Sequence, residues 1–185
     1  MTLIGRFRGL TGDRRGSVSI EMAMLLPLLI TLLGGAVETV NYVLLHQKME
    51  RTSATLADLS AQSTRMTEGQ ISSLFLAVAR IMQPFDLATE GNVIITSISA
   101  RNGQPATIDW QRSSGSQHNA SAFGRQGDRA SLPAGLTVRD GDNVITCEAW
   151  FDYRPVLFTG LIAEGMVYRS AVFRPRFGKL DVLYP

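Results

Sequence analysis

A long hydrophobic pattern occupies the first third of the chain and changes character along its length. From Met22 to Val37, sixteen consecutive residues are uncharged and mostly apolar; counted from Ser17, with Glu21 accepted within it, the run has 21 residues. Beyond Val37, apolar residues recur at helical spacing with polar residues between them, and no Pro or Gly interrupts this second part. The pattern predicts one helix from Ser17 to about Gln62, first apolar and then amphipathic, on the order of 70 Å long.

The apolar run is just long enough to cross a bilayer, because the hydrocarbon core needs about 20 helical residues. It follows a basic leader, residues 1–16, whose charged residues are Arg6, Arg8, Arg14, Arg15 and Asp13. Positive residues beside a span favour retention of that side in the cytoplasm. The leader therefore predicts a cytoplasmic N-terminus, with the rest of the chain across the membrane.

Three simple interpretations of the run stay open at this point. It is a secretory signal peptide cut after Ala36, an uncut single-span anchor, or a buried core helix, the last being least favoured by the length and the basic flank. Two features favour something more specific. The helical pattern continues past Ala36, and Glu21 places a carboxylate in an apolar run, which is costly unless it meets a positive partner.

The residues around Gly16 form an ordered set of motifs. A basic leader ends in Gly16, and Glu21 lies five residues beyond it; Leu26-Pro27-Leu28, a second acid at Glu38 and a polar helical stretch from Gln47 to Ala54 follow. This set resembles the TadE-like pseudopilins of the tight-adherence (Tad, Flp) pilus system, within the type IV pilin-like superfamily. The resemblance covers about 40 of the 185 residues directly.

The resemblance implies a processing site and an assembly residue. A prepilin peptidase would cut between Gly16 and Ser17, and the Glu21 carboxylate would pair with the new N-terminal amine of a neighbouring subunit. Such a pair in an apolar setting favours correct register more than it adds net stability. The simpler alternative for Glu21 is an acid favoured by the dipole at a helix N-terminus.

Three further residues in the run are candidates for helix shape and packing. Pro27 removes a backbone hydrogen bond and either kinks the helix or is an irregularity without functional weight. Gly34 and Gly35 offer a close-packing surface to another helix, although adjacent glycines lack the usual four-residue spacing.

The implied partners are the prepilin peptidase, other pilin or pseudopilin subunits, the pilus assembly platform and membrane lipid. The implied protein is a single-pass inner-membrane minor pilin with a periplasmic C-terminal domain. It would act in priming or at the tip of a pilus for surface attachment, either waiting in the membrane or incorporated into the pilus. The alternative is an uncut, anchored periplasmic sensor or adaptor.

The remaining chain predicts an α+β, pilin-like domain. Thr67 and Gln70 form a capping box before a helix over residues 68–82, which ends before Pro84. The predicted remainder is an antiparallel sheet of about four strands (92–100, 106–112, 142–153, 167–173), a long loop (113–141), a short apolar helix (155–164) and an irregular tail (173–185). The predicted organisation is therefore a leader (1–16), a span (17–45), a helix extension (46–66) and a periplasmic domain (67–185).

Composition gives little support for catalysis. The chain has one cysteine, Cys147, in an alternating strand that favours its burial, and two distant histidines, His46 and His118. No catalytic triad, phosphate loop or metal-ligand spacing is present, so we expect no enzyme activity, metal or cofactor. The net charge of +2 also gives no support for a nucleic-acid partner, and loss of the leader would change it to −1.

Overall fold

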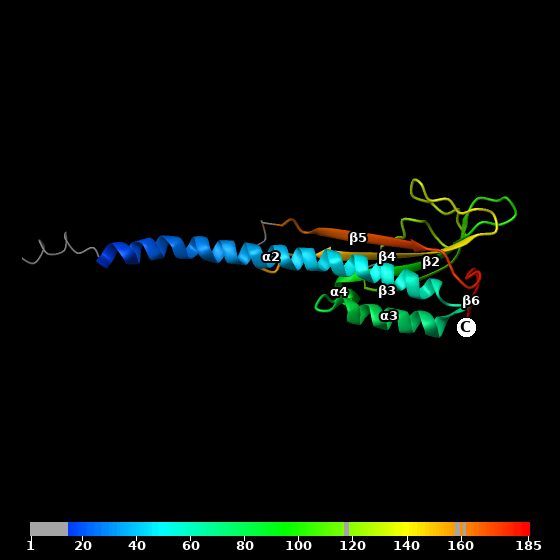
Figure 1. The fold of residues 1–185 in the computed structure, drawn as a ribbon, viewed down its shortest axis with the longest axis horizontal. Coiled ribbons are helices and arrows are strands. Elements are labelled where there is room, and N and C mark those ends of the chain that lie inside the picture. The colour runs from blue at the N-terminus through cyan, green and yellow to red at the C-terminus, as the bar shows by residue number, and fades with distance from the viewer. Residues whose placement is uncertain (1–14, 117–118, 158–159, 161) are drawn as a thin grey trace, which may run out of the picture.

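A computed structural model of the chain describes residues 15–116, 119–157, 160 and 162–185 (Figure 1). Apart from the backbone of its last two residues, the basic leader lies outside this part. In chain order the elements are α2 (Arg15–Ala61), β1 (Met66–Thr67), α3 (Glu68–Met82), α4 (Leu87–Glu90), β2 (Gly91–Ser99), β3 (Thr107–Gly115), β4 (Asn143–Tyr153), β5 (Gly165–Phe173) and β6 (Leu183–Tyr184). The predicted α+β class is confirmed.

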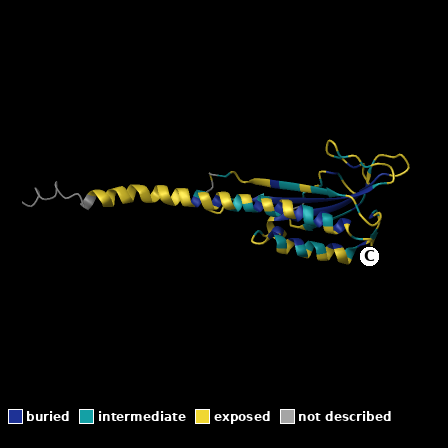
Figure 2. Cartoon of the chain, viewed as in Figure 1, coloured by how far each residue is buried: buried dark blue, intermediate teal, exposed yellow. Residues whose placement is uncertain are grey.

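The predicted long helix is also confirmed, because α2 runs without a break for 47 residues. Its N-terminal half projects from the domain (Figure 1) and is exposed along its length (Figure 2). Burial begins at Gly34 and continues along one face of the C-terminal half, at Glu38, Leu45, Met49, Thr52, Ser53, Leu56, Ala57, Ser60 and Ala61. The helix changes from exposed to packed about where its sequence changes from apolar to amphipathic.

The main sheet is antiparallel throughout, with strand order β3-β2-β4-β5. Helix α2 packs against β4 and β5, and α3 packs beside α2. The alternation predicted for β4 is confirmed, because one set of its residues joins Leu45 and Met49 of α2 in the larger hydrophobic cluster: Ile145, Cys147, Ala149, Phe151 and Tyr153. One face of the sheet thus buries the amphipathic half of α2.

The long segment between β3 and β4 covers the other face of the sheet. Phe123 and Ala130 from this segment pack with Ile98, Ile108 and Val144 in a second hydrophobic cluster. The segment is irregular, as predicted, and a single bridge joins it to β3. Its packing explains why β2 is buried at every position, on both faces.

The capping box at the start of α3 is confirmed. The backbone N–H of Gln70 donates to Thr67 Oγ1 over 3.2 Å, and the backbone N–H of Thr67 donates to Gln70 Oε1 over 2.9 Å. At the other end of α3, Lys48 Nζ of α2 donates to the carbonyl of Ile81 over 2.8 Å. Both ends of α3 are therefore held by specific polar contacts.

Two predictions about the C-terminal part are wrong. The described residues of 155–164 form no helix, and the backbone N–H groups of Val156 and Leu157 donate to the Glu38 carboxylate. The tail is not wholly irregular either, since β6 pairs in parallel with β1, and the Leu180 carbonyl accepts from Trp110 Nε1 over 2.7 Å. The short helix α4 was not predicted, and the strand limits differ by up to three residues.

Candidate functional site on the N-terminal helix

The apolar half of α2 has the length and composition of a membrane span. Its most apolar window has a mean hydropathy of 2.0, and only 6% of that window is buried. Every residue from Ser17 to Leu33 is exposed, including large side chains such as Leu32 and Leu33. A core helix would be covered by its own domain, so this exposure contradicts the interpretation as a buried core helix. Among the described residues, α2 is the one helix long and apolar enough to cross a membrane.

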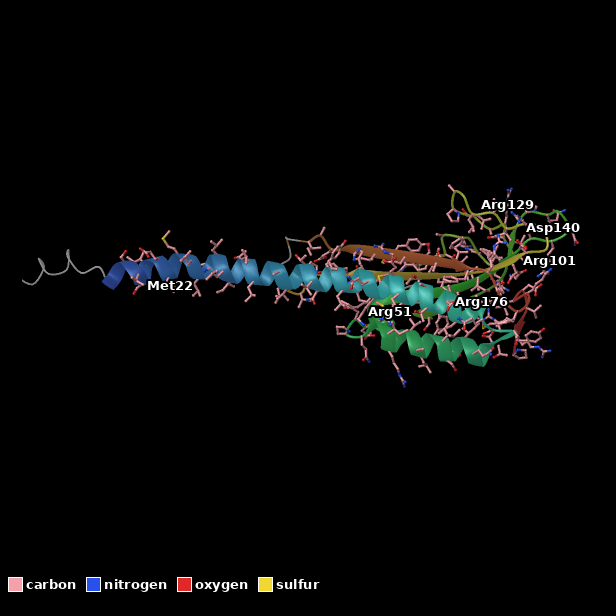
Figure 3. The ribbon with its side chains drawn as sticks, in the orientation of Figure 1. Met22, Arg51, Arg101, Arg129, Asp140 and Arg176 are labelled. Atoms are coloured by element: carbon pink, nitrogen blue, oxygen red, sulfur yellow. The ribbon has the colours of Figure 1, made fainter. Side chains whose placement is uncertain are left out.

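Glu21 is the only charged residue of this half after the leader, and it is exposed. Its Oε1 accepts a hydrogen bond from Ser17 Oγ over 3.1 Å. The spacing of four residues places Ser17 and Glu21 on the same face of the helix. Figure 3 labels the neighbouring Met22 on the projecting part of α2, far from the sheet. Glu21 therefore lies where only lipid or another protein can meet it if this part of α2 spans a membrane.

The helix is continuous through Pro27. The hydroxyl of Thr31 donates to the Pro27 carbonyl over 2.8 Å, and that of Thr39 donates to the Gly35 carbonyl over 2.8 Å. These bonds satisfy both hydroxyls within α2, where an unpaired hydroxyl would be costly in lipid. The proposed effects of Pro27 on helix shape and of the glycines on packing stay predictions.

Gly34 and Gly35 lie at the transition between the two halves of α2. Gly34 is buried and Gly35 is partly buried, whereas the turn before them is fully exposed. Gly34, which has no side chain, lies on the same face of α2 as Glu38, which follows one turn later. This face is the one on which the domain meets the helix.

Glu38 is completely buried at the point where α2 joins the domain. Its Oε1 accepts a hydrogen bond from the hydroxyl of Tyr153, at the end of β4. Its Oε2 accepts from the backbone N–H groups of Val156 and Leu157, each over 3.0 Å. A buried carboxylate is costly unless it is hydrogen-bonded, and these donors satisfy that requirement. Glu38 therefore fixes the segment after β4 to the helix.

Aromatic rings surround this contact. Tyr42 lies one turn after Glu38, and its ring meets that of Tyr153 edge-on at 5.1 Å between centroids. Tyr42 also contacts the ring of His46, at 4.2 Å. Burial and the neighbouring Glu38 carboxylate raise the pKa of Tyr153, so its hydroxyl stays a donor at physiological pH.

In the sequence alone, Glu38 stands out only as the end of the apolar run and as the second acid of the family pattern. One signal could have shown more. Glu38, Leu45, Met49 and Leu56 are separated by seven, four and seven residues, which places Glu38 on the same helix face as the core residues. An acid on that face needs donors from the domain, but the sequence does not say which ones.

The domain contains a second buried carboxylate, Glu148 of β4, on the opposite face of the sheet. It accepts from the hydroxyl of Ser121, from the backbone N–H of Ala122 over 2.9 Å and from the hydroxyl of Tyr168 over 2.9 Å. Burial raises the pKa of Glu148, and the hydrogen bonds oppose that shift. These contacts tie the long loop to the sheet.

The domain offers no obvious catalytic or metal-binding arrangement in its described part. No group of three or more His, Cys, Asp or Glu residues is placed to hold a metal ion there. Cys147 is completely buried, as predicted, and burial raises the pKa of its thiol, so it is not a reactive thiolate.

These features define a class of protein: a small α+β domain built on the second half of a single helix whose first half is an exposed, apolar candidate membrane anchor. The sequence of α2 is the part of the chain that matches a known family. Residues 16–58 match the model of a family described as TadE-like protein, which confirms the resemblance seen in the sequence. Over this segment the chain is similar to TadE-like proteins, a family associated with the Tad pilus.

The match includes Gly16, Glu21, Pro27 and Glu38 but ends at Asp58, before the sheet. No curated protein and no solved structure matches the chain. The association with the Tad pilus therefore rests on the helix.

Proposed function

We propose that this chain is the precursor of a minor pilin or pseudopilin of a tight-adherence pilus and that a prepilin peptidase cuts it between Gly16 and Ser17. One observation carries the proposal. An apolar helical segment with a single acid, Glu21, begins directly after Gly16 and projects, fully exposed, from a folded domain. A subunit that assembles through its helix needs that helix free of its own domain. The match of residues 16–58 to TadE-like proteins supports the same role.

The proposed topology has the leader in the cytoplasm and the domain in the periplasm, with the helix in the inner membrane. From Ser17 to Val37 the helix rises on the order of 30 Å, which equals the thickness of a bilayer hydrocarbon core. Glu38, with its donors from the domain, would then lie at the periplasmic boundary. We therefore place the span at residues 17–37 and assign residues 38–45, which the sequence analysis included in the span, to the helix packed on the domain.

The proposed role of Glu21 is to pair with the N-terminal amine of Ser17 in a neighbouring subunit. An exposed carboxylate within lipid favours any neighbour that brings a positive charge to it. The hydroxyl of Ser17 donates to one oxygen of Glu21 in this structure, and none of the described residues donates a hydrogen bond to the other oxygen. The mature subunit would then wait in the membrane or join the pilus, where it acts in priming or at the tip.

One observation favours the alternative, an uncut anchored adaptor. The bond between Gly16 and Ser17 lies within the helical backbone of α2, and a protease needs its substrate bond unwound. The bond is in the first turn, however, where the backbone N–H groups lack helical partners and the helix unwinds easily.

The N-terminus of the membrane-extracted protein separates these functions. Intact mass and N-terminal sequencing should give a chain that begins at Ser17. A start at Met1 would support the uncut anchor, and a start at Val37 would support a secreted protein. The structure makes the last outcome the hardest to accommodate, because the cut would fall one residue before the buried Glu38.

A further inference from the structure

A small apolar surface lies beside the point where α2 leaves the domain. Val156 and Leu157, which follow β4, have exposed fractions of 73% and 53%. We call Val156 and Leu157 the exit patch. Large apolar side chains exposed together indicate a surface that another phase or molecule covers.

The contact with Glu38 fixes the height of this patch along the helix. The backbone N–H groups of Val156 and Leu157 each lie 3.0 Å from Glu38 Oε2. Glu38 directly follows the 21 exposed residues of the proposed span, so the patch lies within about one helical turn, roughly 5 Å, of the end of the apolar run. Figure 1 shows the end of β4 and the start of β5 beside α2, at the end of the domain from which the helix projects.

We infer that the exit patch inserts into the outer, periplasmic boundary of the bilayer as a second lipid contact beside the helix. Val156 and Leu157 would enter the edge of the hydrocarbon region while their backbone stays bonded to Glu38. The inference rests on the membrane span of the proposed function and deepens it by adding lipid as the partner of a surface outside the TadE-like segment.

A cation lies beside the patch. Arg154, two residues before Val156, is 68% exposed at its side chain and pairs with Asp152 at 2.9 Å. A long Arg side chain can keep its charge among lipid headgroups while the neighbouring apolar residues go deeper. Apolar residues followed or preceded by a cation are typical of segments that lie in the membrane interface.

The inference also has a structural consequence for the domain. A helix alone leaves the domain free to tilt relative to the membrane surface. A second lipid contact on one side of α2 restricts that tilt. Because Glu38 and Tyr153 hold the segment after β4, the orientation would be transmitted rigidly.

Fluorescent probes on the full chain in lipid nanodiscs test the inference. Single cysteines are introduced as Leu157→Cys, Val156→Cys, Phe177→Cys and Leu28→Cys, each labelled with an environment-sensitive dye at one copy per disc. Phe177 is the matched control, because it is 65% exposed and lies in the C-terminal tail. Its neighbour Arg176 is labelled in Figure 3 on the part of the domain away from the projecting half of α2. Cys147 is buried, so the labelled wild-type protein measures background.

We expect dye at residues 156 and 157 to shift to shorter emission wavelength and to be quenched by nitroxides near the lipid headgroups. Dye at residue 28 should be quenched by nitroxides deep in the acyl chains, and dye at residue 177 by neither. If dye at residues 156 and 157 is quenched no more than dye at residue 177, while dye at residue 28 is quenched, the inference is overturned and the membrane span stands. Shielding from both lipid and aqueous quenchers would overturn it in favour of a protein partner, and absence of quenching at residue 28 would overturn the span itself.

Discussion

Glu38 and Tyr153 are 115 residues apart in the sequence, and a hydrogen bond joins them inside the protein, with the Tyr153 hydroxyl donating to Glu38 Oε1. This bond links the end of the apolar helix to the end of the central strand β4. The two backbone donors that follow β4 complete the contact on the other oxygen. A TadE-like helix is thereby joined to a domain that lies almost wholly outside the family match. The contact is where the two parts of the molecule depend on each other.

Removal of the Tyr153 hydroxyl should destabilise the domain. In Tyr153→Phe, Glu38 loses one donor while the packing of the ring is kept, and we expect a loss of about 1–3 kcal/mol in the free energy of unfolding. Denaturant unfolding of the full chain in detergent, followed by tryptophan fluorescence, would measure it. The control is Tyr184→Phe, at an exposed tyrosine of β6. Equal stabilities for the two variants would show that the bond to Glu38 contributes nothing.

Substitutions of Gly16 should separate recognition by the peptidase from membrane insertion. Gly16→Ala adds one methyl group and is expected to leave at least part of the chain cut, whereas Gly16→Arg adds a long cation directly at the bond and should block cutting. The uncut variant should still enter the membrane, because the apolar run is unchanged. Immunoblots of membrane fractions with intact-mass analysis would measure both. Efficient cutting of Gly16→Arg would remove Gly16 from the processing site.

Sequence reasoning predicted the elements whose pattern is local and long. Three features leave a signal within a few turns or one strand: the helix from residue 17 to about 62, the capping box at Thr67 and Gln70, and the alternation of β4. The face of α2 that packs on the sheet was also present in the amphipathic pattern. These features were confirmed because tertiary contacts agree with local preference in each of them.

Features that depend on distant partners were not predicted. Residues 155–164 read as a short apolar helix, but the described residues among them are not helical. Val156 and Leu157 donate to Glu38, and no local signal reports an acceptor more than a hundred residues away. Strand β6 has two residues, too few for a period, and exists because Met66 lies beside Leu183. The candidate processing and assembly residues came from the resemblance, and the fold adds the exposure of Ser17 and Glu21.

The buried carboxylate of Glu148 should make stability depend on pH in a defined direction. Burial raises its pKa in the folded state, so the folded protein binds more protons than the unfolded protein above the ordinary Glu value of about 4.3. This group therefore makes the folded state less stable as the pH rises through the interval between the two pKa values.

Glu148→Gln removes that dependence with little change of shape. An amide oxygen in the place of Oε1 keeps the contacts with Ala122 and Tyr168, and the Ser121 hydroxyl can turn to accept from the amide nitrogen. Stability relative to wild type should therefore be higher near pH 7 than near pH 4, as measured by denaturant unfolding at both pH values. Glu90→Gln, at an exposed carboxylate, is the control. A difference between Glu148→Gln and wild type that is the same at both pH values would contradict the assignment.

Loss of the Glu21 carboxylate should stop assembly without stopping processing. Glu21→Ala leaves Gly16, the leader and the apolar run unchanged, so the chain should still begin at Ser17, but the neighbour's amine would have no acid to pair with in lipid. Ser17→Ala is the matched control: it removes the hydroxyl that donates to Glu21 over 3.1 Å and keeps the amine. Side-chain hydrogen bonds within a membrane contribute on average only about 0.6 kcal/mol, so Ser17→Ala should assemble normally. N-terminal sequencing together with electron microscopy of surface pili measures both steps, and normal piliation in Glu21→Ala would refute the pairing.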